Sequence, residues 1–257
     1  MWATEVEAAA PAADRRLPWR VAEVLEVRRE TPRASTLVLD VSGWPGHLAG
    51  QHVDVRLTAE DGYQAQRSYS IASPPGAPHL ELTVDRIEEG EVSPYLTGEL
   101  RRGDRFELRG PVGLYFAWTA PGEAPLFLVA GGSGIAPLMA MLRHRAAAGG
   151  RVPARLLASW RGAEDIIYRE ELARLAAAGD GLVVSHTLTR TRPAGWDGYD
   201  RRIDAAMLAE AGFPPAAQPD VFVCGPTPHV EAAAAALVAL GHAPARIRTE
   251  RFGPSGG

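Results

Sequence analysis

The sequence has one cysteine, no lysine and no long apolar run, and each of these absences narrows the possible functions. The single cysteine, Cys224, excludes an internal disulfide, a zinc site made of several thiolates and an iron–sulfur cluster held by four cysteines. No apolar run approaches the roughly 18 residues that a membrane-spanning helix needs. The first residues also lack the basic and apolar regions of a signal peptide. We therefore expect a cytoplasmic protein with no metal site and no membrane contact.

The positive charge of the chain comes from arginine. All 27 of the Lys/Arg positions are arginine, and the formal net charge is −4 at pH 7. This balance does not indicate nucleic acid as a partner. The guanidinium fork suits phosphates and carboxylates, although a GC-rich genome accounts for the same bias equally well.

The 257 residues, 46% of them apolar, are enough for two domains with separate cores. Residues 1–17 have the composition of a flexible tail. In residues 18–119, short apolar–polar alternations separated by glycine, proline and aspartate predict an antiparallel six-stranded barrel. The six expected strands are 19–30, 34–43, 50–58, 66–73, 79–87 and 104–113. A short helix is expected at 93–100, with Ser93 as its N-cap and Pro94 in its first position.

Residues 120–257 follow a different pattern, in which strands alternate with helices. The run LFLVA at 126–130 is apolar throughout, as in a strand buried on both faces. Four more strands are expected at 154–160, 181–190, 220–225 and 246–252. Helices are expected between them, the second at 165–179. This alternation predicts a doubly wound parallel sheet.

A glycine-rich turn, VAGGSGIAPL, joins the first of these strands to its helix. Gly132 and Gly134 let the backbone turn tightly and approach a ligand, and Pro137 fits the first turn of the helix. Free N–H groups and the helix dipole then form a diphosphate site. Proline replaces the third glycine of the dinucleotide fingerprint, so a tight connection without a ligand remains an alternative.

The fourth strand of this half ends in VCGPTPHV. In a doubly wound sheet the site lies at the carboxyl ends of the strands, so Cys224 and Gly225 are expected to border the same crevice as the glycine-rich turn. Thr227 is expected to cap the next helix. The alternative for Cys224 is a buried small apolar residue. A second motif, GPSGG at 253–257, matches the G-x-S-x-G pattern of serine hydrolases but has no helix after it, so we reject hydrolase chemistry.

The strand AQRSYSIAS carries an arginine and several hydroxyls that a purely structural strand does not need. A period of two places Arg67 and Tyr69 on one side and Gln66 and Ser68 on the other. Ser70 breaks this parity. If Tyr69 and Ser70 are to contact one ligand, either Ser70 reaches it from the backbone edge of the strand, or the strand bends or bulges after Tyr69.

Four stretches, RSYS, GGSGIAP, VCGP and TERFG, follow one another in the order found in the ferredoxin–NADP reductase family of flavoenzymes. Together they resemble that family over residues 18–257, and most closely its bacterial two-domain members without a fused ferredoxin module. The resemblance implies a flavin-binding barrel followed by an NAD(P)-binding domain, with FAD as cofactor and NADPH, less favourably NADH, as donor.

The resemblance also implies roles for residues near the flavin. Arg67 would pair with the flavin diphosphate, Tyr69 would lie against the ring and Ser70 would hydrogen-bond near its reactive nitrogen. Glu250 would lie at the hydride-transfer site, and Phe252 would cover the flavin face that the nicotinamide occupies. The remaining flavin-binding positions implied are Ser68 and the turn residues Gly90, Val92 and Ser93. For Glu250 a surface carboxylate, and for Phe252 a strand core residue, remain alternatives.

The nucleotide-binding positions follow from the same resemblance. Gly132, Ser133, Gly134 and Pro137 would hold the diphosphate, and Cys224, Gly225 and Pro226 would flank the nicotinamide, with Ser70, Cys224 and Glu250 as catalytic residues. A bare ribose prefers a carboxylate at the end of the second strand. That strand instead ends with Ser159 and Arg161, near Arg190, in the pattern of NADPH users. Glu164 and Asp165 are expected further on, at the start of the next helix.

The family's activity implies that NADPH passes a hydride to FAD, which then gives electrons to a ferredoxin, a flavodoxin or an oxygenase. No partner is named by the sequence, and a monomer is the default expectation. Two alternatives remain: a ferric-siderophore or free-flavin reductase of the same fold, and a non-catalytic nucleotide-binding regulatory subunit.

Overall fold

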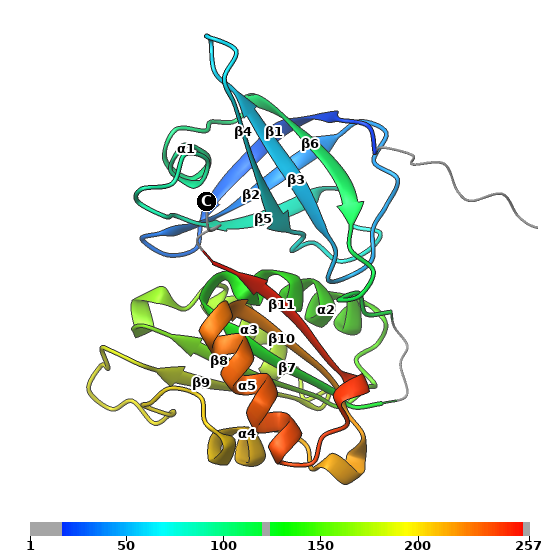
Figure 1. The fold of residues 1–257 in the computed structure, drawn as a ribbon, viewed down its shortest axis with the longest axis vertical. Helices are drawn as coiled ribbons and strands as arrows, with labels where there is room; N and C mark the ends of the chain where they lie inside the picture. Colours follow the sequence, from blue (N-terminus) through cyan, green and yellow to red (C-terminus); the bar gives the residue numbers. More distant parts are fainter. Residues whose placement is uncertain (1–16, 120–123, 254–257) are drawn as a thin grey trace, which may run out of the picture.

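The computed structural model describes residues 17–119 and 124–253. It contains a six-stranded sheet followed along the chain by a five-stranded sheet. Figure 1 shows the two halves stacked along the long axis, with the last strand running along the side of the second half that faces the first. The predicted domain boundary at 119/120 adjoins residues 120–123, which lie outside the described residues. Residues 1–16 of the predicted tail and residues 254–257, the PSGG portion of the rejected hydrolase motif, also lie outside them.

The first half is an antiparallel barrel whose six strands were all predicted. They are β1 (Arg20–Arg29), β2 (Ala34–Val41), β3 (His52–Thr58), β4 (Gln64–Ser70), β5 (Leu80–Asp85) and β6 (Arg105–Val112). Their order in the sheet is β4-β3-β6-β1-β2-β5. A bridge between Ile71 and Leu82 closes the sheet on itself. Alternate residues of these strands, such as Val53 and Val55, fill the barrel core.

The second half is a parallel sheet with helices on both faces, also as predicted. Its strands are β7 (Leu126–Gly131), β8 (Ala154–Trp160), β9 (Leu182–Leu188), β10 (Asp220–Pro226) and β11 (Ile247–Phe252), in the order β11-β10-β7-β8-β9. The helices are α2 (Ile135–Ala147), α3 (Arg169–Ala177), α4 (Ala205–Ala211) and α5 (Thr227–Ala239), and α1 (Ser93–Gly98) lies in the first half. Short 3-10 turns cover Gly132–Gly134, Ala163–Asp165, Pro215–Ala217 and Pro244–Arg246.

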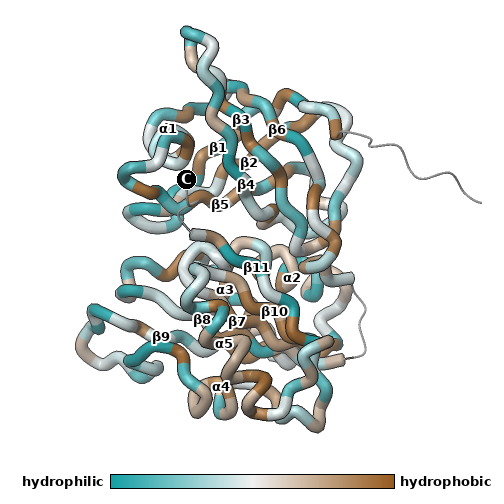
Figure 2. Tube along the Cα trace, in the orientation of Figure 1, coloured by the Kyte–Doolittle hydropathy of each residue, from teal (hydrophilic) through white to brown (hydrophobic). Residues whose placement is uncertain are grey.

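The strand order places the site of the second half. The chain leaves β7 toward β8 on one side and returns to β10 on the other, so the order reverses between β7 and β10, where such sheets bind ligands. Strands β7 and β10 are the apolar centre of this sheet in Figure 2. One core cluster packs α2 and α3 against the sheet and includes Ala34, Ala49 and Ala72 of the barrel half. The other packs α4 and α5 on the opposite face.

Three local predictions about helix starts are wrong. Ser93 is the first residue of α1 and Val92 holds the N-cap position, because the Ser93 hydroxyl instead accepts a hydrogen bond from the Ile87 N–H at 3.0 Å. Thr227 likewise begins α5, with Pro226 in the cap position and no side-chain cap. The helix expected at 165–179 begins only at Arg169, because a 3-10 turn and the left-handed residue Tyr168 precede it.

No helix within residues 17–119 and 124–253 has the length and apolar character needed to cross a membrane.

Candidate active site

β4 pairs regularly with β3 up to its last residue, so no bulge follows Tyr69. Arg67 and Tyr69 pair with the core-facing Val55 and Val53 of β3, so both lie on the inner side of the strand. Ser70 is the last residue paired with β3, opposite His52, and the next residue already pairs with β5. The chain therefore changes neighbours directly after Ser70, where the barrel closes.

Ser68 lies on the opposite side of β4, as the period of two predicted. Its hydroxyl donates to a carboxylate oxygen of Asp54 at 2.7 Å, and Asp54 also accepts from the Arg109 guanidinium at 3.0 Å. The Ser68 side chain is thus held on the outer face, away from Arg67 and Tyr69. The Ser68 hydroxyl is therefore already engaged within the barrel.

Arg67 reaches toward the turn that precedes α1. Its guanidinium is half exposed and lies 3.2 Å from a carboxylate oxygen of Glu91, which also accepts from the Tyr63 hydroxyl at 2.8 Å. Glu91 is followed directly by Val92 and Ser93. The structure therefore brings Arg67 near the turn Gly90–Ser93, which lies 20 residues or more away in the chain, and both Val92 and Ser93 are buried there.

The glycine-rich turn and the end of β10 touch each other. Residue Cys224 of β10 pairs with Ala130 of β7. Gly134 comes so close to this strand that a Cβ on it would lie 2.2 Å from the Cys224 carbonyl oxygen, while Gly132 has a left-handed φ of +55°. Only glycine allows both conditions. The structure therefore places the Cys224 backbone directly against this turn.

Glu250 of β11 is paired with Cys224 and is largely buried. Burial raises the pKa of its carboxyl to about 7. One carboxylate oxygen has no hydrogen-bond partner among the described residues, and the other lies 3.9 Å from Nδ1 of His52. Glu250 is therefore not a surface carboxylate, and near neutral pH it is able to hold or release a proton.

Cys224 is fully buried, as its alternative interpretation held. Burial, and then the neighbouring Glu250 carboxylate, raise the pKa of its thiol well above the usual value. The side chain is a neutral thiol at physiological pH and therefore a poor nucleophile. Its contribution at this position is shape and a close backbone, whose carbonyl the Gly134 turn approaches.

Phe252 ends β11 opposite Pro226 and is 39% exposed, so it is not a core residue of the strand. Its position two residues after Glu250 puts it at the same end of the sheet. Gly225 and Pro226 complete β10 at this edge, and Ser133 lies in the turn Gly132–Gly134.

The carboxyl end of β8 lies beside that of β7. Ser159 of β8 pairs with Gly131. Arg161 follows, and its carbonyl accepts from the Arg190 N–H at 2.9 Å, so the two exposed arginines share one edge. The carboxylates of the intervening 3-10 turn are engaged: Asp165 accepts from the Gly162 N–H at 3.0 Å, and Glu164 from the Thr191 hydroxyl at 3.3 Å.

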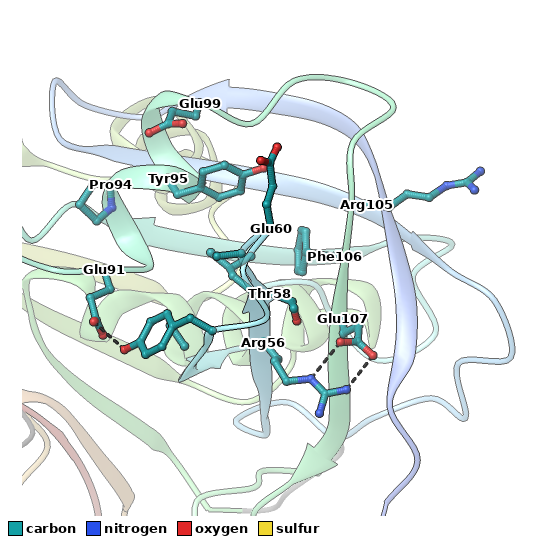
Figure 3. Close-up of a pocket in the computed structure, with 14 residues that line it drawn as sticks. Arg56, Thr58, Glu60, Glu91, Pro94, Tyr95, Glu99, Arg105, Phe106 and Glu107 are labelled. Atoms are coloured by element: carbon teal, nitrogen blue, oxygen red, sulfur yellow. Dashed lines mark hydrogen bonds and ion pairs between the residues drawn. The ribbon is translucent and has the colours of Figure 1, made fainter.

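A cavity of about 670 Å³ opens beside α1, between the β3–β4 hairpin and β6 (Figure 3). Glu60, Glu91, Glu99 and Glu107 line it, and Arg56 is held by Glu107 at 2.7 Å. Arg105 also lines the cavity and is paired with Glu23, so the four carboxylates outnumber two arginines that are both already paired, which disfavours a phosphate. We therefore do not assign the cofactor diphosphate to this cavity.

Sequence reasoning missed His52. Its alternation with Val53 and Val55 marks it only as an outward polar residue of a strand. Burial lowers the pKa of its imidazole, and its neighbour Glu250 comes from the last strand of the other half. No pattern within β3 signals a contact over that distance along the chain.

Two family models match the chain. One, described as an oxidoreductase FAD-binding domain, covers residues 24–116, and the other, an oxidoreductase NAD-binding domain, covers residues 128–235. The matches fall on the barrel and on the parallel sheet. The chain thus carries an FAD-binding and an NAD-binding oxidoreductase domain in that order.

Similar proteins include several reductases. The chain is 35% identical over 209 residues to the glycine betaine monooxygenase reductase subunit of Pseudomonas aeruginosa, a match of 80% of this chain and only 56% of that protein's length. It is 40% identical over 185 residues to ferredoxin–NADP reductase B of Sorangium cellulosum, covering 69% of this chain and 73% of the relative. NADH-cytochrome b5 reductase 1 of Aspergillus terreus is 34% identical over 215 residues, covering 80% and 71%.

Among solved structures, the cytochrome P450 reductase of Amycolatopsis superposes with a TM-score of 0.81 at 28% identity. The match covers 93% of this chain and 71% of that one.

Proposed function

The chain belongs to the ferredoxin–NADP reductase family, and from this we propose that it takes a hydride from NADPH onto bound FAD and passes electrons to a partner. The observation that carries the proposal is the 3.9 Å approach of His52, the strand partner of Ser70 in the barrel, to Glu250 of the last strand. The FAD-binding half contributes His52 to this contact, and the NAD-binding half contributes Glu250. FAD supplies the change between two-electron and one-electron chemistry.

The residues at the end of β4 fit a flavin diphosphate. We propose that the Arg67 guanidinium leaves Glu91 to grip phosphate oxygens, for which its fork is suited. The N–H groups of the Gly90–Ser93 turn would face the same anion. Tyr69 would support the ring, and Ser70, the last residue of β4 paired with β3, would hydrogen-bond to its edge.

We propose that the Glu250 carboxyl accepts and releases a proton where the two halves meet. A carboxyl group with a pKa of about 7 exchanges a proton readily at neutral pH. Its unpartnered buried oxygen is a place for a hydrogen bond from a bound group. Phe252 would occupy the nicotinamide position and move aside when the nucleotide binds, consistent with its partial exposure.

For the nucleotide we propose Gly132, Ser133, Gly134 and Pro137 at the diphosphate and Cys224, Gly225 and Pro226 beside the nicotinamide. Ser159, Arg161 and Arg190 would hold the 2′-phosphate of NADPH. The nearby carboxylates are already hydrogen-bonded, which supports NADPH over NADH. One relative is named for NADP and another for NADH, so this preference rests on the arginines.

We propose an oxygenase component or a ferredoxin as the electron acceptor, in the cytoplasm. A relative is the reductase subunit of a monooxygenase, and a similar structure is a cytochrome P450 reductase. A reductase for ferric siderophores or free flavin is the second candidate. A steady-state screen of these acceptors with both donors separates the two.

The NADPH preference is tested with Arg161→Ala. Loss of a charged contact to the 2′-phosphate is expected to raise the KM for NADPH about 10-fold, or roughly 1.4 kcal/mol, and to leave the KM for NADH unchanged. Arg151→Ala, which removes the same charge before the start of β8, is the matched control. Equal changes for both donors would remove the argument for NADPH.

A further inference from the structure

Arg143 lies where the two halves of the molecule meet. It is the ninth residue of α2, and its side chain is only 12% exposed. Its Nη1 donates to the carbonyl oxygen of Ala72 at 2.9 Å and to Glu81 of β5 at 2.7 Å. Its Nε and Nη2 donate to the two oxygens of Glu171 of α3, at 2.9 and 2.7 Å. One guanidinium thus joins a strand and a loop of the barrel half to two helices of the other half.

Arg143 is the centre of a chain of ion pairs in which arginines and glutamates alternate. Arg28 of β1 pairs with the other oxygen of Glu81, and Arg174 lies 3.8 Å from Glu171. Each carboxylate is therefore shared between two arginines. A fork-shaped pair that is mostly buried holds its geometry better than an exposed one, because both oxygens are fixed and water competes less.

A second contact between the halves lies directly against Arg143. The guanidinium is 5.1 Å from the ring centre of Tyr168, a buried residue with a left-handed φ of 58°. The Tyr168 hydroxyl hydrogen-bonds to Thr83 of β5, which is 2.7 Å from the Thr36 hydroxyl of β2. A non-glycine residue in this conformation is maintained only when its surroundings require it. Here the requirement is the phenol bridge into the barrel.

Arg143 links the segment that follows Ser70 to the helix that follows the glycine-rich turn. Ala72 lies two residues after Ser70, and its N–H is bonded to the Glu81 carbonyl at 2.8 Å. At the other end, α2 begins at Ile135, directly after the glycine-rich turn. Eight residues of helix make a rigid rod of about 12 Å. The position of the turn relative to Ser70 is therefore transmitted through α2 and Arg143.

We propose that Arg143 is a positioning residue that sets the distance and angle at which the nicotinamide meets the flavin. This rests on the proposed function, because it assigns the alignment of that reaction to an interdomain contact. Arg143 touches neither ligand-binding turn, and it acts through Ala72, Glu81 and Tyr168. Hydride transfer depends steeply on such alignment, and a displacement of about 1 Å can cost roughly 100-fold in rate.

The test is Arg143→Met in the FAD-loaded protein, since methionine keeps length and packing over Tyr168 but loses every hydrogen bond. Flavin reduction is followed under anaerobic single turnover with saturating NADPH and with NADPH deuterated at C4. Two binding readouts accompany it: the FAD content, and the Kd of 2′,5′-ADP, which contacts the nucleotide half alone. Arg174→Met is the matched control, because it makes the same charge change at the exposed end of the chain of ion pairs.

We expect Arg143→Met to slow flavin reduction roughly 30- to 100-fold with a deuterium isotope effect, while FAD content and the Kd of 2′,5′-ADP stay within about twofold of the wild type. Arg174→Met is expected to behave as the wild type. A rate within about twofold of the wild type overturns the proposal. A parallel loss of FAD and of 2′,5′-ADP affinity also overturns it, because the role is then general folding.

If Arg143→Met does not fold, Glu81→Gln is judged by the same criteria, because it weakens the link from the barrel side and preserves shape. Flavin reduction in the wild-type protein distinguishes failure of this inference from failure of the proposed function. Wild-type flavin that neither NADPH nor NADH reduces refutes both. Wild-type reduction with an unaffected Arg143→Met refutes the positioning role alone.

Discussion

At the scale of single residues, Glu250 has the most informative environment. Its carboxyl is buried beside a buried thiol and a histidine whose own pKa burial lowers, so no full positive charge offsets its ionisation near neutral pH. The result is a pKa of about 7 against an ordinary value of 4.5. This difference links the stability of the fold to pH.

We predict that Glu250→Gln removes a pH dependence of stability. The folded-state pKa lies above the unfolded value, so the stabilisation by the protonated carboxyl is complete below about pH 4.5 and is lost as the pH rises through 7. Between pH 5 and pH 8 the free energy of unfolding of the wild type should therefore fall by about 2–3 kcal/mol relative to Glu250→Gln. Urea unfolding of the flavin-free protein at several pH values measures this. Identical pH profiles for the two proteins would mean that Glu250 is ionised in the fold at neutral pH.

Some residue positions could be predicted from the local sequence pattern, and others could not. The period of two predicted that Arg67 and Tyr69 share a face of β4 and that Ser68 lies on the other, and the register with β3 confirms both. No bulge follows Tyr69, because β4 stays in register with β3 through Ser70, and the chain changes neighbours only at Ile71, where the barrel closes. The burial of Glu250 was not foreseeable, because it results from neighbours on other strands.

At the scale of elements, the contact between the glycine-rich turn and the end of β10 defines the nucleotide edge. Gly134 is required there by the Cys224 carbonyl. Gly98, at the end of α1, is the contrasting case, since a Cβ there would meet only the Arg86 guanidinium at an ordinary 3.5 Å.

Gly134→Ala is predicted to destabilise the fold by about 3 kcal/mol, because a methyl group 2.2 Å from a backbone oxygen forces the turn away from β10. The affinity for NADP+ should fall with it, since the same turn presents the N–H groups. Gly98→Ala should be neutral or stabilise by up to about 1 kcal/mol. Thermal unfolding and nucleotide titration of both variants measure these effects. A Gly134→Ala variant as stable as Gly98→Ala would refute the close approach.

Strands were predicted more reliably than helix starts, and the reason is physical. Every strand of both sheets follows from alternation or from a continuous apolar run, which depend on burial alone. The cap at Ser93 and the start at Arg169 were misplaced because the first depends on a competing hydrogen bond and the second on a left-handed residue. Such choices are decided by contacts outside the local segment.

At the scale of the whole molecule, function depends on how the two sheets face each other. The resemblance of four motifs implied two domains and their ligands. It did not specify the contacts that join them: His52 with Glu250, Tyr168 with Thr83, and Arg143 with Ala72. These pairs are far apart in sequence and have no shared pattern, so only the structure reveals them.

The central claim is that one chain binds FAD in its first half and receives a hydride from a nicotinamide nucleotide bound in its second. The most direct measurement is anaerobic mixing of the purified protein, saturated with FAD, with NADPH and with NADPH deuterated at C4, while the flavin absorbance is recorded. The account predicts a yellow protein whose flavin is bleached by NADPH more efficiently than by NADH, with a slower rate for the deuterated donor. A colourless protein that takes up no FAD, or bound flavin that neither nucleotide reduces, would contradict it.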